Sequence, residues 1–586
     1  MYLCQSLQQN IYSLYLFHVF YHMELGTFVS TGQELVFHWQ IGRNIYFGFL
    51  MAGDPHITVS ELKEKLERGD NYICKKILYF SDTLRGTNQY WARRYKEVVA
   101  LQQFNINNGD GLPSFFTTGS CAEFHFKPLK RLLAMYFKHT VGRDIDLSIS
   151  SNMFNVLQEN THIVAKYFDL RTLSYFKNVM GPVFGVDCFW YRQEFAKSRG
   201  MVHWHGLCWR KDIEPHSLMH KCIEDGLNDA ECAEALESWA KYEFGLSAEH
   251  PAGCDEAGKP RKDLWPPPEG TAPAPPEEKN PLVKLLMDVC DSQYSILEDY
   301  LLLSNRFNIH RCSDYCLRFN KHNKTEKECR MEFGSQSNPG KPLRSVPDLV
   351  KDRNGCFRLE LLRDHPLLVQ HSRLHTQGRR ANGDISLILS KSSPENPSVS
   401  EIVALEKYTT GYSCKGNKAS KAMFELFYEM IDSSSSHSTA KSFCTKYIKN
   451  TVKRDVSAVE ASSELSRLPL YRCSCSFQSV SLSGFSVLEQ DGSVVTKNTA
   501  LDNYLNRDLD DICSYFTFIS RNGKVAVFSC ATQASWPLTE EYCQTQLLIH
   551  WPSWRKPSDI NPQNTSWVEI MSDFFTDRRL SKFCKG

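Results

Sequence analysis

The sequence predicts an α+β protein. Residues 183–195 and 201–209 are rich in aromatic and β-branched side chains, and a short polar stretch ending in glycine separates them. We therefore expect two strands joined as a β-hairpin. Helical patterns occur on both sides of this hairpin in the sequence, and one of them opens with Pro128, which suits the first turn of a helix. Helices are expected at 128–137, 232–244, 281–303 and 537–550, and a second strand pair around Asn522-Gly523.

Composition limits the class of protein more than it identifies a function. Apolar content is 42% and charged content 23%, as in a globular protein. The net charge of +1 neither supports nor excludes a nucleic-acid partner, so a phosphate-binding surface would have to be a local patch, such as 127-KPLKR-131 or 415-KGNKASK-421.

The 21 cysteines form an odd number and are scattered along a long chain. They indicate reduced thiols with some metal ligands among them, and so a nuclear or cytosolic protein. The apolar run from Ile11 to His22 is too short to span a membrane.

A metal site is predicted on the hairpin, at His203-Trp204-His205. Alternation along a strand puts the two imidazoles on one face, about 7 Å apart. With a two-residue turn at the centre of the hairpin, Glu194 faces His203 and Arg192 faces His205. Two neutral imidazoles and a carboxylate suit a divalent cation that keeps positions open for substrate oxygens. The alternative is a surface strand with two incidental histidines.

Nucleophiles are predicted at Tyr408 and Tyr412. Four residues apart on a helix, they would share one face, with about 6 Å of rise between them. A tyrosine that attacks a phosphodiester would form a 5′-phosphotyrosine, which stores the bond energy for rejoining. Lys407, Lys415 and Lys418 would neutralise flanking phosphates. The alternative is a plain tyrosine stripe on a helix.

A structural zinc site is predicted at His310-x-Cys312-x₃-Cys316-x₁₂-Cys329. Four soft or borderline ligands within 20 residues match a closed tetrahedral Zn²⁺ site. The residues between the last two cysteines are polar and basic, as expected for a loop stabilised by metal rather than by a core. His322 is a competing ligand, and chance clustering in a cysteine-rich chain is the alternative.

Taken together, these motifs resemble the Rep nuclease region of Helitron-type rolling-circle transposases, a two-tyrosine HUH endonuclease. The matching strings are 188-CFWYRQEFAKSRGMVHWHGLCW-209 and 408-YTTGYSCKGNK-418, with the Cys/His cluster between them. Further matches are 113-PSFFTTGSCAEFHF-126 and 379-RRANGDISL-387, and 536-WPLTEEYCQTQLLIHW-551 looks like the connection leading toward the family's helicase. The order and spacing of several motifs make this resemblance specific.

The resemblance implies an HUH nuclease core in which a central antiparallel β-sheet is flanked by helices. It also implies that His203 and His205 bind Mg²⁺ or Mn²⁺, and that Tyr408 and Tyr412 attack single-stranded DNA at transposon ends and target. The reaction would be site-specific nicking and strand transfer. DNA phosphates would contact Lys407, Lys415, Lys418 and Arg199.

The third ligand of the cation, Glu194, follows from the hairpin register, and Glu123 and His125 are its rivals. The expected division of the chain is a poorly defined N-terminal segment at 1–44, a helical region at 45–110, the first part of the nuclease core at 111–250, a Pro-rich linker at 251–280, a helix and zinc-binding module at 281–345, the completion of the nuclease with the tyrosine helix at 346–432, and a C-terminal α+β region at 433–586.

Two departures from the family pattern suggest other functions. Gly119 stands where an apolar strand residue is usual, and a glycine inside a strand weakens packing. No Gly-x-x-x-x-Gly-Lys-Ser/Thr occurs, so we expect no ATPase in this chain and a helicase that is supplied separately. The alternatives are a catalytically inactive, transposon-derived DNA-binding protein and a zinc-containing interaction protein.

Overall fold

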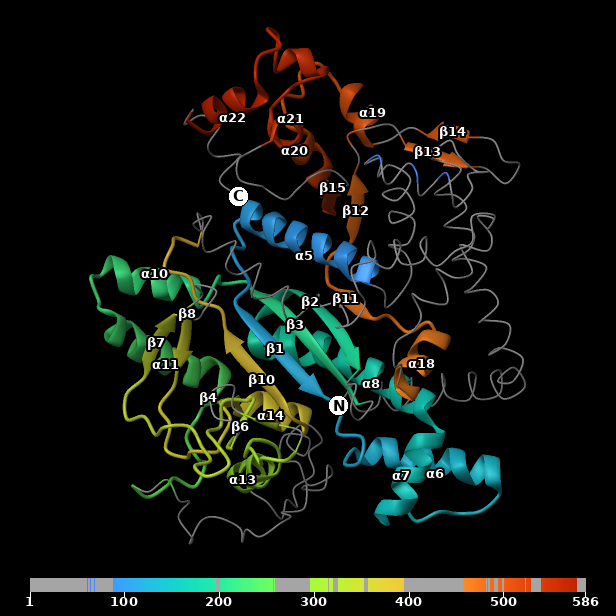
Figure 1. Cartoon of the computed structure of the whole chain (residues 1–586), viewed down its shortest axis with the longest axis vertical. Coiled ribbons are helices and arrows are strands. Elements are labelled where there is room, and N and C mark those ends of the chain that lie inside the picture. The colour runs from blue at the N-terminus through green and yellow to red at the C-terminus, as the bar shows by residue number, and fades with distance from the viewer. Residues whose placement is uncertain are drawn as a thin grey trace.

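A five-stranded antiparallel sheet lies at the centre of the structure, which is a computed structural model (Figure 1). Its strands, in spatial order, are β10 (Gly383–Leu387), β1 (Phe115–Ser120), β3 (Val202–Arg210), β2 (Val186–Phe195) and β11 (Tyr471–Cys473). The structure describes residues 88–195, 201–256, 296–314, 316–319, 325–351, 357–394, 457–480, 485–488, 494–497, 500–521, 523–528 and 539–576, with single residues at 61, 64, 68, 258 and 482.

The hairpin of β2 and β3 has the register that the sequence predicted. Glu194 pairs with His203, and Arg192 pairs with His205. Strand β1 pairs with the other edge of β3, and β10 pairs with β1. Strand β11, from a much later part of the chain, pairs with the free edge of β2. The predicted α+β class with a central antiparallel sheet is therefore confirmed.

One face of the sheet, which we call the front face, packs against the long helix α5 (Asn88–Asn108). Val98 and Leu101 of this helix share a hydrophobic cluster with Trp190 of β2 and Leu207 of β3. Because side chains alternate along a strand, His203 and His205 lie on the same face as Leu207. The front face is therefore partly a hydrophobic core and partly, at one end of the hairpin, polar.

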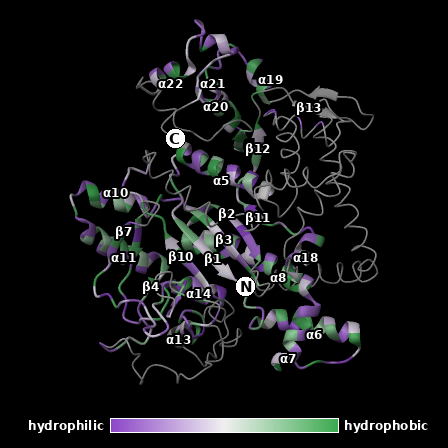
Figure 2. Ribbon diagram, viewed as in Figure 1, coloured by the Kyte–Doolittle hydropathy of each residue, from purple (hydrophilic) through white to green (hydrophobic). Residues whose placement is uncertain are grey.

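The opposite face, the back face, carries the largest hydrophobic core, in which Phe168, Tyr191 and Trp204 are fully buried. The helices that cover it contribute mainly through one apolar side, and Figure 2 shows hydrophobic and hydrophilic stretches alternating along them. The helices whose buried residues join this core are α6 (Lys127–Val141), α7 (Ser150–Glu159), α8 (Thr161–Tyr175), α9 (Gly181–Phe184), α10 (His216–Glu224) and α11 (Asp229–Phe244), together with a π-helical turn at Phe176–Met180.

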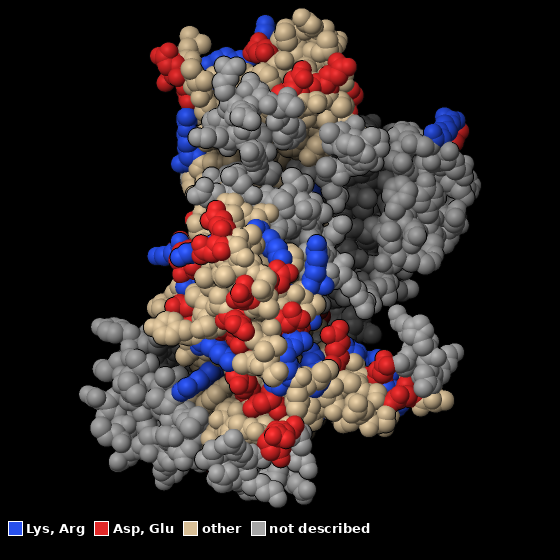
Figure 3. Space-filling view, turned by 90° about the vertical axis from the view of Figure 1, so that its left-hand side faces the viewer, with Lys and Arg blue, Asp and Glu red and all other residues tan. Residues whose placement is uncertain are grey.

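Local sequence signals explain where α11 begins and ends. The side chain of Asn228 accepts hydrogen bonds from the first turn, and Glu231 bonds back to the Asn228 backbone, which completes a capping box. Gly245 ends the helix in the left-handed conformation. The side of the molecule with α10 and α11 shows basic and acidic side chains intermingled rather than one basic surface (Figure 3).

Two further helices connect the sheet with the Cys/His region. Helix α13 (Ile296–Phe307) packs against α14 (Arg373–Arg379), and buried Asp299 forms an ion pair with Arg380 (3.1 Å). Short strand pairs complete this part: β4 (Leu246–Ser247) with β9 (His371–Ser372), β5 (Leu317–Phe319) with β6 (Lys327–Cys329), and β7 (Asp348–Lys351) with β8 (Phe357–Glu360).

The C-terminal part has a hydrophobic core of its own, around buried Tyr504 and Tyr515. Its elements are β12 (Phe477–Val480), β13 (Phe485–Leu488), β14 (Val494–Lys497), α19 (Ala500–Leu505), α20 (Tyr515–Ser520), β15 (Val525–Phe528), α21 (Glu540–His550), a 3₁₀ turn at Pro557–Asp559 and α22 (Trp567–Thr576). Helix α18 (Ala458–Leu465) precedes them and packs instead against α8, where Val459 meets the back-face core.

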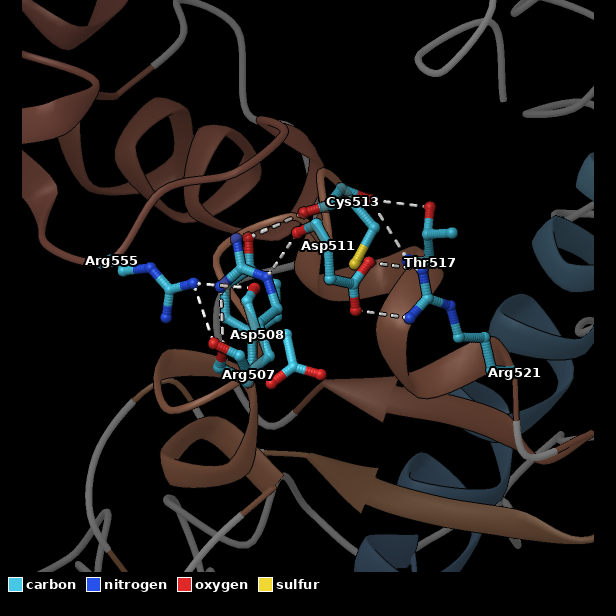
Figure 4. Close-up of polar contacts among 9 residues, drawn as sticks. Arg507, Asp508, Asp511, Cys513, Thr517, Arg521 and Arg555 are labelled. Carbon is cyan, nitrogen blue, oxygen red and sulfur yellow. Dashed lines mark hydrogen bonds and ion pairs between the residues drawn. The ribbon is translucent and has the colours of Figure 1, made fainter.

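Arginines fix the loop between α19 and α20 (Figure 4). Arg507 donates to the backbone oxygens of Tyr504 (2.7 Å) and Asp511 (3.0 Å). Arg555 donates to the carbonyl of Arg507 (2.9 Å), and Arg521 makes a two-pronged contact with the Asp511 carboxylate (2.6 and 2.7 Å). The loop is therefore held by charged hydrogen bonds from three directions.

The strand pair predicted around Asn522-Gly523 is wrong. Residues before this turn form helix α20, and β15 after it pairs in parallel with β12. Strand-like composition in 515-YFTFIS-520 is equally suited to the buried side of a helix, and here Tyr515 and Ile519, four residues apart, enter the core together. Among the described helices, none combines the length and the apolar character needed to cross a membrane.

Candidate metal sites

The β2–β3 hairpin brings Glu194, His203 and His205 together on the front face. The Glu194 Oε2 atom lies 3.6 Å from Nε2 of His203 and 3.2 Å from Nε2 of His205. One ligand atom from each of the three residues lies within 4.8 Å of the other two. Three converging oxygen and nitrogen donors of this kind can hold one divalent cation.

The surroundings of these side chains suit a cation with open positions. Exposed fractions are 26% for His203, 17% for His205 and 37% for Glu194, so the group is accessible from one side. Burial opposes ionisation of Glu194, but hydrogen bonds from the two imidazoles, with the charge of Arg192, hold the pKa of this carboxyl below its usual range. Glu194 is therefore ionised at neutral pH, as a carboxylate ligand has to be.

Packing against Phe116 holds the His205 ring in place. The two rings stack at 5.7 Å between centroids. The Nδ1 atom of His205 is buried and has no hydrogen-bond partner among the described residues. A metal-binding histidine usually donates its second N–H to a partner. Here the ring orientation rests on stacking instead.

Neither rival of Glu194 joins the histidine pair in the described part of the chain. The Nε2 atom of His125 lies 2.8 Å from a guanidinium nitrogen of Arg306. Burial, with the charge of Arg306, lowers the pKa of His125 to about 4. Glu123 instead interacts with the buried thiol of Cys121. Both therefore have other contacts, and Glu194 is the carboxylate at the pair.

The predicted Cys/His set also comes together, around the β5–β6 hairpin. The ligand atoms of His310, Cys312, Cys316 and Cys329 all lie within 4.8 Å of one another. The His310 Nε2 atom is 3.4 Å from Sγ of Cys312 and 3.3 Å from Sγ of Cys329. One imidazole and three thiols whose ligand atoms lie this close together can hold one metal ion.

Several contacts prepare this Cys/His cluster for a metal. Burial opposes ionisation of Cys316, but the backbone N–H of Ser313 (3.2 Å) and the neighbouring thiols lower the pKa of this thiol. The His310 ring stacks on Phe333 at 4.4 Å, and burial lowers the pKa of His310, so its imidazole is neutral. A thiolate and a neutral imidazole are the forms that bind a metal. The rival ligand His322 lies outside the described residues.

The predicted nucleophiles are not placed by the structure. Tyr408 and Tyr412 lie outside the described residues, and so do the four predicted DNA-binding residues, Lys407, Lys415, Lys418 and Arg199. The structure therefore brings together the two groups of candidate metal ligands, and the tyrosine and DNA contacts stay predictions.

Three front-face residues near His203 and His205 were not predicted from the sequence. Thr118 pairs with His205, and Ser120 pairs with His203, across β1 and β3. Asp384 of β10 pairs with Thr118 on the other side of β1, so Asp384, Thr118 and His205 are neighbours across the sheet. Burial raises the pKa of Asp384. Both strands lie in segments that matched the family motifs, but their pairing could not be known without the sheet order.

The comparisons with known proteins agree with the motifs. Residues 4–208 match the family model described as the Helitron helicase-like domain at the N-terminus. The match includes β1, β2 and most of β3, and it ends just after His203 and His205. No curated protein matches the chain.

Proposed function

We propose that this Helitron-type chain is a metal-dependent endonuclease that nicks single-stranded DNA at specific sites and transfers the strand during rolling-circle transposition. The resemblance to the family region over residues 4–208 supports a transposon-related role. The observation that carries the enzymatic proposal is the convergence of Glu194, His203 and His205 on one open face of the sheet. The protein would act in the nucleus, where its DNA is.

In the proposed reaction, Tyr408 or Tyr412 attacks a backbone phosphorus. The phenolic oxygen forms a bond to phosphorus, the bond to the 3′ oxygen breaks, and that oxygen leaves as a 3′-hydroxyl after taking a proton. The 5′-phosphotyrosine is resolved when another 3′-hydroxyl attacks the same phosphorus. Glu194, His203 and His205 would hold Mg²⁺ or Mn²⁺, which polarises the phosphate. Lys407, Lys415, Lys418 and Arg199 would neutralise neighbouring phosphates.

We further propose that the Cys/His cluster holds a structural Zn²⁺. All four of its side chains point to one place, with Cys316 and Cys329 buried. A site with four protein ligands has no open position for a substrate. Its role would be to stabilise the segment between α13 and β7, which has only a small hydrophobic cluster around Phe333.

Gly119 does not indicate that the protein is a catalytically inactive descendant of a transposase. The indole of Trp204 occupies the space next to Gly119, so that a Cβ there would lie 2.6 Å from ring atoms. The glycine is therefore required by the packing of this strand, and the departure from the family pattern is compensated inside the protein. A catalytically inactive, DNA-binding protein remains the alternative outcome of the test below.

The test is the formation of a covalent adduct between the full chain and a labelled single-stranded oligonucleotide in Mn²⁺. We expect a band that is stable in denaturant with the wild type and absent from the double variant Tyr408→Phe/Tyr412→Phe. Tyr242→Phe is a matched control, because that tyrosine is 86% exposed and lies on α11, and its adduct should be unchanged. An adduct that survives the double change would refute the assignment. Tight DNA binding without any adduct would favour the inactive alternative.

A further inference from the structure

On the back face of the sheet, behind His203 and His205, two paired positions are glycines and therefore carry no side chain. Gly119 of β1 pairs with Gly383 of β10 on one side and with Trp204 of β3 on the other. The Trp204 ring lies against Gly119, and the His375 ring lies against Gly383, where a Cβ would be 2.3 Å from its Nε2. The two glycines therefore admit two rings directly beneath the strands.

His375, on helix α14, connects that helix to β1. Its Nε2 lies 3.0 Å from the carbonyl oxygen of Thr118, and its Nδ1 lies 2.8 Å from the hydroxyl of Tyr175. Because a carbonyl can only accept, Nε2 carries the proton and donates, and Nδ1 accepts from the tyrosine. Burial lowers the pKa of His375 to about 3, so this neutral form persists at neutral pH. Thr118 is the residue that pairs with His205.

Arg379, one turn further along α14, makes a second connection to β1. Its Nη2 donates to the carbonyl oxygen of Ser120 (2.9 Å), and Ser120 pairs with His203. Its guanidinium lies 5.1 Å from the centre of the Trp204 ring. Burial lowers the pKa of Arg379 to about 10, so the side chain keeps its charge at neutral pH.

The burial of Arg379 is costly, which argues for a specific role. Its side chain is 1% exposed, and its Nε and Nη1 atoms have no hydrogen-bond partner among the described residues. An unpaired buried charge is unfavourable, whereas an apolar side chain of the same length would fill the space without that penalty. What the guanidinium adds over such a side chain is the hydrogen bond to Ser120 and the cation–π contacts with the rings of Trp204, Tyr175 and Phe168.

We propose that His375 and Arg379 are positioning residues for the cation site. From the back face they hold β1 at the two residues that pair with His205 and His203. Trp204, which stands between those histidines on β3, is enclosed by the same side chains. The arrangement fixes the relative position of the two imidazoles without touching them. The proposal rests on the proposed function, because its consequence is measured at the cation site.

Arg380 offers a matched control. It is the next residue, it is also buried, at 5% exposure, and it carries the same charge. Its ion-pair partner is Asp299 on α13 rather than a carbonyl of the sheet. Changing Arg380 therefore removes a buried arginine from the same end of α14 while leaving the contacts to β1 in place.

The first experiment measures Mn²⁺ binding to the full chain by electron paramagnetic resonance. We expect Arg379→Met to weaken binding roughly 10- to 100-fold, as loss of a group that supports ligands does. Arg379→Lys, which keeps the charge and a donor, should recover part of the affinity. Arg380→Met should stay within about threefold of the wild type. Wild-type affinity in Arg379→Met, or equal losses in both methionine variants, would overturn the proposal.

A second pair of variants covers the case in which Arg379→Met does not fold. His375→Gln keeps a donor for the Thr118 carbonyl, and His375→Phe fills the same space without one. We expect weaker Mn²⁺ binding with phenylalanine than with glutamine. Equal binding by the two variants would count against a positioning role for His375.

Hydrogen exchange of the backbone amides separates this proposal from the proposed function. In Arg379→Met we expect faster exchange in peptides covering 115–120 and 202–210 than in Arg380→Met. If the wild type binds no Mn²⁺ at the histidine pair, the proposed function fails, and the exchange result alone decides. Faster exchange would still support the part of the proposal in which Arg379 holds β1 and β3 in position, and unchanged exchange would overturn it.

Discussion

The two groups of candidate metal ligands in this protein are built in different ways. The Cys/His cluster takes four ligands from 20 consecutive residues and encloses them around one short hairpin. The hairpin site takes three ligands from two strands of the central sheet and leaves one side accessible. The first has the features of a closed structural site, and the second those of a site that keeps positions for a substrate.

This difference indicates which interactions stabilise each site. The Cys/His cluster has little core around it, so a metal bound there would supply much of the local folding energy. The hairpin site stands on the five-stranded sheet, which is the largest among the described residues, between the core of the front face and that of the back face. It should therefore keep its shape without a cation, but it should be sensitive to packing changes beneath the sheet.

The largest effect is expected from Cys329→Ser. Loss of one ligand from the closed site should release the zinc and unfold the segment around β5 and β6, because metal binding contributes on the order of 10 kcal/mol to such folds. Zinc content and limited proteolysis check this. Cys254→Ser, which changes a half-buried cysteine outside the cluster, is the control. If the variant keeps its zinc, Cys329 is not a ligand. Mn²⁺ binding at the hairpin should change little.

A smaller effect is expected from Gly119→Ala at the sheet. The added Cβ would lie 2.6 Å from the Trp204 ring, so we expect a loss of roughly 1–3 kcal/mol in the free energy of unfolding from overpacking. Gly378→Ala is the matched control, because its Cβ would lie 3.5 Å from the Tyr175 ring, an ordinary contact within helix α14. It should be neutral or stabilise by up to about 1 kcal/mol. Denaturant unfolding measures both, and equal effects would contradict the packing argument.

The smallest effect concerns His371, which joins β9 to helix α13. Its Nε2 lies 2.6 Å from the hydroxyl of Tyr300 on α13, and burial lowers its pKa to about 4. The unfolded imidazole binds a proton more readily than the folded one. The stability that His371 contributes is therefore complete above its unfolded pKa of about 6.5 and is lost as the pH falls toward 4.

At pH 5.5 this loss should be roughly 1 kcal/mol relative to pH 7. His371→Gln, which does not titrate, should lack that part of the pH dependence. Denaturant unfolding at the two pH values is the measurement. The same loss of stability on acidification in the variant and in the wild type would show that protonation of His371 does not contribute to the pH dependence.

Much of both sites could be predicted from the sequence because their geometry is local. The register of β2 and β3 was predicted by assuming a two-residue turn and by the alternation of side chains along a strand, and on that basis Glu194 was expected opposite His203, where it lies. The four residues of the Cys/His cluster are close together in the chain, so their spacing in the sequence predicted that their side chains would lie close together in the structure. The roles of the metals and of Tyr408 and Tyr412 stay predictions.

What the sequence alone determined is therefore the α+β class, the hairpin register and which residues lie together in the two groups of candidate ligands. Only the tertiary structure decided that β11 completes the edge of the sheet, that β15 pairs with β12, and that Gly119 makes room for Trp204. The physical reason is that periodicity specifies which face of an element is buried, whereas pairing between distant segments depends on side chains that meet only after folding.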